Sequence, residues 1–139
     1  MHAMDERRWE GRGKILAFAA IVEVGTGLVL MFDPALVAAL LVGANLASAG
    51  NVLGRWAGIV LVALGLACWP GPPRAAGGSA AFRGMLTYNS LTALYLAYLG
   101  TLGHLRGFLL WPGVALHAVV ALLLMWTWRR HGDVGKSAP

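Results

Sequence analysis

The chain has 139 residues, of which 58% are hydrophobic and only 12% are charged, and its mean hydropathy is +0.68. Soluble domains carry about 25% charged residues, so a soluble fold of this length could not bury so much apolar surface and lipid must cover it. The net charge of +5 comes from basic residues at the ends of apolar runs, as membrane topology requires, and does not indicate a nucleic-acid-binding surface.

Motifs for enzyme chemistry are missing from the sequence. The single cysteine, Cys68, excludes an internal disulfide, and we interpret it as an inert small hydrophobic residue. There is no P-loop, HExxH, CxxC, GxSxG or GxGxxG pattern. We therefore assign no catalytic residue and no metal site, and an enzyme is the less favoured interpretation.

The first apolar run, KILAFAAIVEVGTGLVLMF, predicts a membrane span over about 15–32. It follows a polar leader, residues 1–13, which we expect to be a frayed cytoplasmic terminus. The run is about twice as long as the apolar core of a signal peptide, so we expect it to be retained. Glu23 lies in its middle and is the only acidic residue in any predicted span.

A short helix is predicted after the first span. Asp33 and Pro34 end the span and also suit the start of a new helix, as its cap and its first residue. The apolar stretch over about 34–47 is too short to cross a bilayer and has no charged face. We predict a non-spanning helix there, either re-entrant or interfacial.

The second span is predicted over about 52–69, with Arg55 near its start. Gly54, Gly58 and Gly65 fall on one face, which would let another helix approach closely. The alternative is that this spacing of glycines arises by chance in an apolar helix.

Two further spans are predicted, over about 84–103 and 108–128, after a proline- and glycine-rich loop at 70–83. The third span is the most polar, with Tyr88, Thr92 and Tyr95 on one face and Asn89 beside them. The fourth carries His117 in its middle. The tail, residues 129–139, is basic and then polar.

The distribution of basic residues predicts the orientation. With four spans, nine of the 11 basic residues lie on the side of both termini, and only Arg55 and Arg106 lie on the other. This bias places both termini in the cytoplasm. If residues 34–50 also crossed, the count would be six against five and the bias would vanish, which favours four spans.

The sequence thus predicts an all-α integral membrane protein, a single domain over 1–139 built as a four-helix bundle with one extra short helix. Counting helical rise from the cytoplasmic side places Glu23, Thr92, Tyr95 and His117 in one layer near the membrane midplane. A charged carboxylate at that depth costs about 2.5–3.5 kcal/mol, so the neutral acid is favoured.

Two interpretations of this layer remain open. It could form a proton relay or a polar pocket for a quinone-like or small solute, with Tyr88 and Asn89 as further members. Alternatively, Glu23 could hydrogen-bond between helices and lock their packing. A haem is left open as well, although His117 is the only histidine in a predicted span and two imidazoles are usual for such ligation.

Several features resemble the DoxX-like group of small four-helix bacterial inner-membrane proteins. The matching features are a glycine-rich second half of the first span (EVGTGLVLMF), the following Asp33-Pro34, a short apolar helix ending near LVGAN, and a second span that opens with GRWAG. The resemblance covers about residues 14–128. It implies a four-helix fold and, for some members, a role as a membrane partner of oxidoreductases.

The leading functional hypothesis is a non-enzymatic accessory, binding or transport-type module with a polar midplane site. The alternatives are a quinone- or haem-linked membrane subunit of an oxidoreductase and a purely structural scaffold that uses the glycine face. We expect the partners to be the lipid bilayer and either another membrane protein or a second copy of this chain, and not a nucleic acid. The expected location is the bacterial inner membrane.

Overall fold

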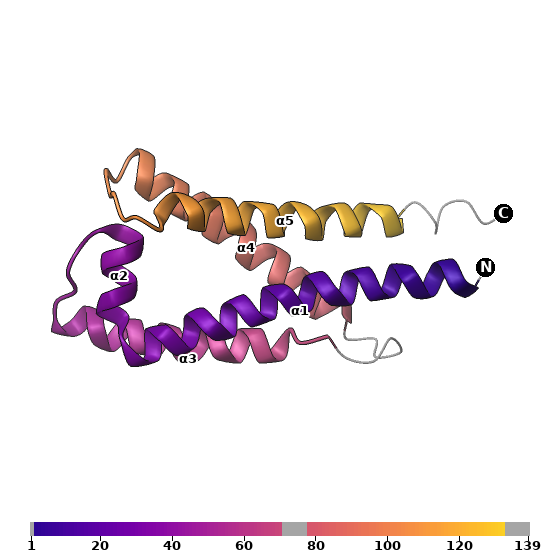
Figure 1. Cartoon of the computed structure of the whole chain (residues 1–139), viewed down its shortest axis with the longest axis horizontal. Coiled ribbons are helices and arrows are strands. Elements are labelled where there is room, and N and C mark those ends of the chain that lie inside the picture. The colour runs from indigo at the N-terminus through magenta and orange to yellow at the C-terminus, as the bar shows by residue number, and fades with distance from the viewer. Residues whose placement is uncertain (1, 71–77, 133–139) are drawn as a thin grey trace.

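The computed structural model describes residues 2–70 and 78–132, and all of the regular structure in these residues is helical. In chain order, the helices are α1 (His2–Phe32), α2 (Pro34–Val42), α3 (Ser48–Ala67), α4 (Gly78–Thr101) and α5 (Leu110–Gly132) (Figure 1). The fold is therefore all-α, with a short helix directly after the first long one, as the sequence predicts.

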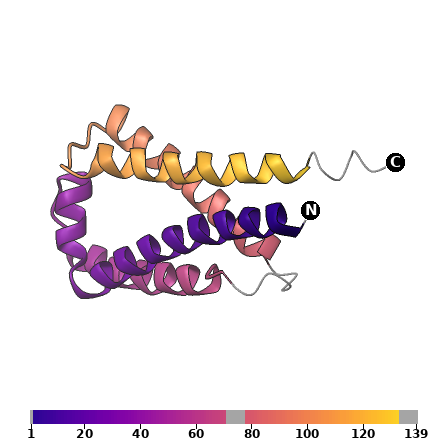
Figure 2. The same ribbon diagram turned by 45° about the vertical axis from the view of Figure 1, so that its right-hand side comes forward.

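The four long helices form two pairs. α1 packs antiparallel to α3, and α4 packs antiparallel to α5 (Figures 1 and 2). The short helix α2 stands across one end of the molecule and touches α1, α3 and α5. The start of α1 and the end of α5 both lie at the other end, where α3 ends and α4 begins.

Local interactions explain where α2 begins and ends. Its first turn is capped by Asp33, whose Oδ1 accepts a hydrogen bond from the Leu36 amide at 3.0 Å, and Pro34 is its first residue. Gly43 ends the helix in a left-handed conformation with φ 71°, which a glycine adopts without steric cost. The helix is therefore shorter than the predicted range of 34–47.

Other helix ends differ from the predicted ranges. α1 starts at His2 and so includes most of the predicted leader, because residues 2–13 contain no proline and can extend a helix that already exists. α4 starts at Gly78, inside the predicted loop at 70–83, whose three prolines all precede position 74. α5 starts two residues later than predicted and ends at Gly132.

Backbone contacts fix α2 to the start of α5. The Leu109 amide donates to the Leu40 carbonyl at 2.7 Å. Gly107 sits against the backbone of Leu41 so closely that a side chain there would overlap it. Because α2 also follows α1 after a single residue, it holds the two helix pairs together at this end.

Glycines form the closest contact between α1 and α3. A methyl group at Gly58 would lie 2.6 Å from the Gly27 carbonyl oxygen, and one at Gly65 would lie 2.7 Å from the Ala20 carbonyl oxygen. Gly54 faces Pro34, at the start of α2. The three glycines of the predicted packing face thus lie against helices of the same chain, where only a hydrogen leaves room for the neighbouring backbone.

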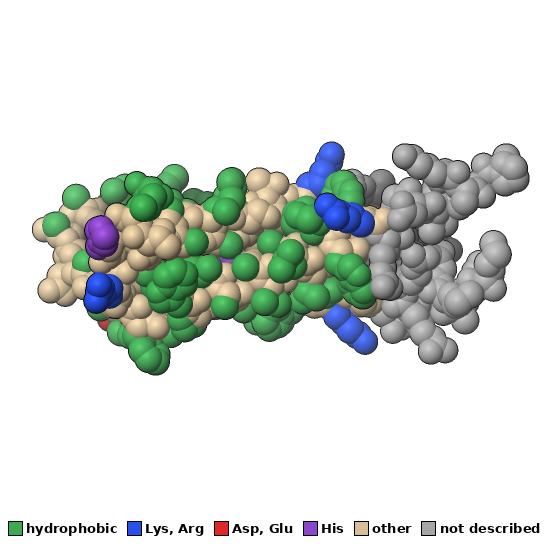
Figure 3. Space-filling model, turned by 90° about the horizontal axis from the view of Figure 1, so that it is seen from above, with side chains coloured by type: hydrophobic (Ala, Val, Ile, Leu, Met, Phe, Trp, Pro, Cys, Tyr) green, Lys and Arg blue, Asp and Glu red, His purple; other side chains and the backbone are tan. Residues whose placement is uncertain are grey.

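In the part of the chain that the structure describes, three helical segments are long and apolar enough to cross a membrane: Gly13–Phe32, Ser48–Ala67 and Leu110–Arg129. Their outer faces carry exposed large apolar side chains, among them Ile21, Ile59 and Leu122. In Figure 3, hydrophobic side chains cover the middle of the molecule and basic ones gather toward the ends. The chain is therefore a small polytopic membrane protein in contact with lipid.

Candidate functional site

Glu23 lies at the centre of the membrane-length part of α1. It is nine residues from both Lys14 and Phe32, about 14 Å along the helix in each direction. Its side chain is only 1% exposed. A carboxyl group is thus held in the interior of the protein, far from both ends of the apolar segment.

The pattern of α1 explains why Glu23 points inward. Leu16, Ala19 and Ala20 precede it at helical spacing and are all buried, whereas Phe18 and Ile21 are exposed to the lipid side. The small alanines one turn before Glu23 let α1 pack closely, so the carboxyl falls between α1, α4 and α5.

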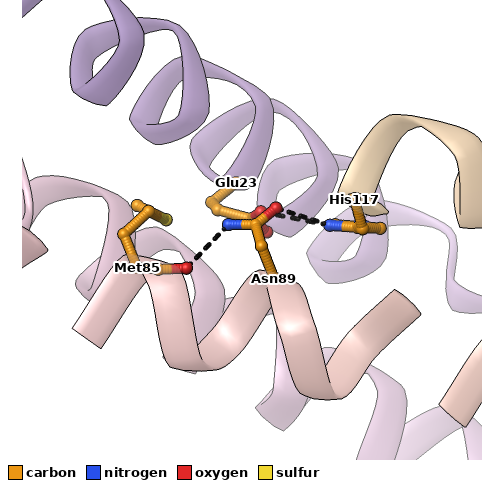
Figure 4. A network of polar contacts seen from close by, with 4 residues as sticks. All are labelled: Glu23, Met85, Asn89 and His117. Atoms are coloured by element: carbon orange, nitrogen blue, oxygen red, sulfur yellow. Dashed lines mark hydrogen bonds and ion pairs between the residues drawn. The ribbon is translucent and has the colours of Figure 1, made fainter. Parts of the chain in front are cut away.

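Asn89 orients the polar groups around Glu23 (Figure 4). Its Nδ2 donates to the Met85 carbonyl oxygen at 2.9 Å, one turn earlier on α4. Since a carbonyl oxygen only accepts, this bond fixes the amide so that Oδ1 points away from Met85. Oδ1 lies 2.9 Å from His117 Nδ1, so that nitrogen must carry a hydrogen and donate it.

The Glu23 carboxyl is the unusual group in this cluster. Its Oε1 lies 3.9 Å from His117 Nδ1, close enough for an ion pair but too far for a hydrogen bond. Neither of its oxygens makes a well-aligned hydrogen bond with a described residue, although the Tyr88 hydroxyl lies close enough to interact with the carboxyl. His117 already donates Nδ1–H to Asn89, so the imidazole does not serve the carboxyl as a hydrogen-bond donor.

Tyr88 completes the cluster from α4. Its ring meets the His117 ring edge-on, with centroids 5.9 Å apart and an interplanar angle of 80°. Its hydroxyl lies within reach of the Glu23 carboxyl and of Thr92, which is beside it on the next turn. The cluster is thus formed by Glu23 from α1, Tyr88 and Asn89 from α4, and His117 from α5, and we call it the Glu23 cluster.

The structure brings four of the six predicted site residues together and places Thr92, half-buried, next to them. Tyr95 is not part of the cluster: it is 61% exposed and stacks on Tyr98, with centroids 6.5 Å apart. The reason is the orientation of α4. Its buried stripe runs through Phe82, Met85, Asn89, Ala93 and Leu96, and the stripe with Tyr88 and Tyr95 lies at the edge of it.

Sequence reasoning missed Met85, whose backbone carbonyl sets the orientation of Asn89. The only signal available was the four-residue spacing, at which an asparagine side chain can reach a preceding carbonyl in a helix. Spacing alone could not show that the contact forms.

The described residues contain no group of three or more histidine, cysteine, aspartate or glutamate side chains that could hold a metal ion. His104 lies in the exposed loop between α4 and α5, with a φ of 53°, and does not approach His117. A second imidazole for haem ligation is therefore not provided by the described part of this chain.

Comparison with known proteins gives no family: no family model, curated protein or solved structure matches the chain. The resemblance to the DoxX-like group rests on the sequence features alone and stays a prediction.

Proposed function

We propose that this protein is a non-enzymatic, transport-type module of the bacterial inner membrane in which the Glu23 cluster takes up and releases a proton. The observation that carries the proposal is a carboxyl that is 1% exposed, makes no well-aligned hydrogen bond with a described residue, and lies 3.9 Å from an imidazole nitrogen.

This geometry argues against a purely structural role for Glu23. A glutamate that locks helices together would hydrogen-bond to a neighbouring helix, and such bonds are nearly universal for buried polar groups. Here His117 Nδ1–H is committed to Asn89, and the Tyr88 hydroxyl, although close, forms no well-aligned hydrogen bond with the carboxyl. An unpaired buried polar group costs about 1–3 kcal/mol, and ionisable groups retained at such a cost inside membranes usually act on ions or protons.

The chemistry available to the cluster is proton exchange between a carboxyl and an imidazole. When Glu23 is ionised, His117 can accept a proton on Nε2 and become an imidazolium, which the carboxylate at 3.9 Å stabilises. Movement of the Nδ1 hydrogen from the imidazolium to the carboxylate then leaves a neutral pair. The net result is one proton transferred from the Nε2 side of His117 to Glu23.

His117 is the less buried member of the pair and is the residue that we assign to pass the proton. Its side chain is 13% exposed, against 1% for Glu23, so a proton reaches the carboxyl most readily through the imidazole. Asn89 holds the ring with Nδ1 toward Glu23 and leaves Nε2 free to accept. In this scheme, Glu23 stores the proton, His117 passes it and Asn89 positions His117.

We further propose that α4 is a fourth span and that both termini are cytoplasmic. Lys14, Arg83 and Arg129 are exposed and lie 18, 18 and 19 residues from Phe32, Thr101 and Leu110, the opposite ends of their helices. At the helical rise, these separations are about 27–29 Å, close to the thickness of the hydrocarbon core. Lys14, Arg83 and Arg129 thus lie at one depth on three helices, and we call them the basic ring. Their common depth supports a membrane boundary at this level.

Proton flux into liposomes tests the proposal. The purified protein is reconstituted around a pH-sensitive dye, and a potassium diffusion potential drives protons inward. We expect wild-type liposomes to acidify faster than empty ones and Glu23→Gln liposomes to acidify at the empty rate. Asp33→Asn is the matched control, because it removes the exposed carboxylate that caps α2 and should keep the wild-type rate. Equal rates for wild type and Glu23→Gln would contradict the proposal.

A further inference from the structure

A recess lies between α4 and α5 at the end of the molecule that carries the basic ring. Its volume is about 360 Å³ and it is open to the outside. It is lined by Arg83, Leu86, Thr87, Met125, Trp128 and Arg129. In Figure 3, basic side chains gather at this end, at the border of the apolar band.

The lining of the recess is divided between charge and apolar surface. Arg83 and Arg129 come from different helices and sit at nearly the same depth, and neither forms an ion pair with a carboxylate whose side chain the structure describes. Leu86 and Met125 lie one turn further along α4 and α5, toward the middle of the span. The recess therefore changes from basic to apolar over about one helical turn.

Trp128 gives the recess a rigid aromatic wall. Its ring packs on Phe82, with centroids 5.5 Å apart, while 40% of its surface stays exposed. Phe82 is 2% exposed and belongs to the core, so the indole is held in place. Indoles favour the level of the lipid headgroups, and Trp128 thus marks this depth as the membrane interface.

We propose that this recess is a binding site for one anionic phospholipid. The phosphate lies between the Arg83 and Arg129 guanidinium groups, which present paired donors suited to phosphate oxygens. The Thr87 hydroxyl faces the headgroup, and an acyl chain runs along Leu86 and Met125. A soluble acidic peptide would match the arginines but not the apolar surface beneath them, whereas a phospholipid matches both.

Native mass spectrometry of the full-length protein in detergent tests this assignment. The protein is titrated with phosphatidylglycerol and, separately, with phosphatidylcholine of the same acyl chains. We expect one phosphatidylglycerol to be retained in preference to phosphatidylcholine. Arg83→Gln/Arg129→Gln should weaken phosphatidylglycerol binding about 30-fold, the size of effect that two basic residues have on attraction to an anionic lipid surface.

Matched variants separate the site from general charge effects. Arg55→Gln/Arg106→Gln removes the same charge from the other end of the molecule and should keep wild-type binding. Lys14→Gln removes one charge at the same depth, on α1, and should bind more tightly than Arg83→Gln. Arg83→Lys/Arg129→Lys keeps the charge and should recover part of the affinity.

Two results would overturn the proposal: equal retention of the two lipids by the wild type, or equal weakening by the Arg83/Arg129 and Arg55/Arg106 double variants. Thermal melting of each variant in detergent checks that the fold is intact. Should the Gln pair fail to fold, the comparison of Arg83→Gln with Lys14→Gln decides the question, since equal affinities would also reject the site.

Discussion

Glu23, Asn89 and His117 are three polar side chains in an apolar interior, and they differ in how many of their hydrogen-bonding groups have a partner. Asn89 makes both of its contacts, to Met85 and to His117, whereas the Glu23 carboxyl makes no well-aligned hydrogen bond within the described residues. Replacing a residue that contributes to packing by an apolar one should lower the stability of the protein. Replacing a residue that is retained for activity should raise it.

Glu23→Leu should therefore stabilise the protein. It replaces a buried carboxyl that makes no well-aligned hydrogen bond by an apolar side chain of similar size, and relief of such a group is worth about 1–3 kcal/mol. We expect a higher melting temperature in detergent together with the loss of proton flux in liposomes. A lower melting temperature would mean that Glu23 holds helices together, which is the packing interpretation.

Asn89→Leu should have the opposite effect on stability. It leaves His117 Nδ1–H without its acceptor in a part-buried position, at a cost of about 1–3 kcal/mol, so the melting temperature should fall. In the double variant with Glu23→Gln, the two changes should not be additive, because both residues act on the same imidazole. Additive shifts in melting temperature would indicate that Asn89 and Glu23 do not share His117.

At this scale, the sequence predicts part of the site. The depths of Glu23 and His117 follow from counting residues along an apolar helix, and the structure does bring these two side chains together. The rotation of α4 does not follow from its own sequence, because Tyr88, Thr92 and Tyr95 form as regular a face as the one that is buried. The exposed position of Tyr95 depends on how α4 packs against α5 and α1, which is a tertiary effect.

The helix pair α1 and α3 depends on glycines whose position matters more than their number. Gly27 faces Gly58 and Val62 of α3, whereas Gly25, two residues earlier, has open space around it. The two glycines lie on the same helix and in the same apolar segment, so they form a matched pair for a packing test.

Gly27→Ala should destabilise the protein and Gly25→Ala should not. A methyl group at Gly27 would lie 2.7 Å from the Gly58 carbonyl oxygen and 2.9 Å from the Val62 amide nitrogen, so the helices must move apart, at a cost of about 1–3 kcal/mol. At Gly25 the same change only improves helix propensity, by about 1 kcal/mol. Melting temperatures that shift in opposite directions would confirm the contact, and equal shifts would contradict it.

Helix existence was easier to predict than helix ends. Asp33-Pro34 predicts the start of α2 correctly because both the cap and the first residue are local signals. The end of α2 at Gly43 depends instead on its docking, since residues 43–47 have to bridge from α2 to the start of α3 while Gly43 lies against Arg106 and Gly107. The mean hydropathy of α4 is lowered in part by Asn89, which is buried against its neighbours and not exposed on the outer face.

At the scale of the whole molecule, the number of membrane crossings is the main open prediction. Within residues 2–70 and 78–132, three segments meet the apolar requirement for a span, yet α4 has 24 residues and pairs with α5 over a similar length. Its polar residues Asn89 and Tyr88 are turned to α1 and α5, so its low hydropathy reflects the site and leaves an apolar outer face that includes Leu91 and Leu94. We therefore predict that α4 crosses the membrane with the others.

Cysteine accessibility decides between three and four crossings. In a Cys68→Ala background, single cysteines at Gly11, Ala80 and Leu102, which are all exposed positions, are treated with a membrane-impermeant maleimide on spheroplasts. We expect Leu102→Cys to react in intact spheroplasts, and Gly11→Cys and Ala80→Cys to react only after lysis. This result would place the ends of α4 on opposite sides, with the basic ring of Lys14, Arg83 and Arg129 in the cytoplasm. If Ala80→Cys and Leu102→Cys reacted from the same side, α4 would not cross, and the Glu23 cluster would not lie at the centre of a four-helix span.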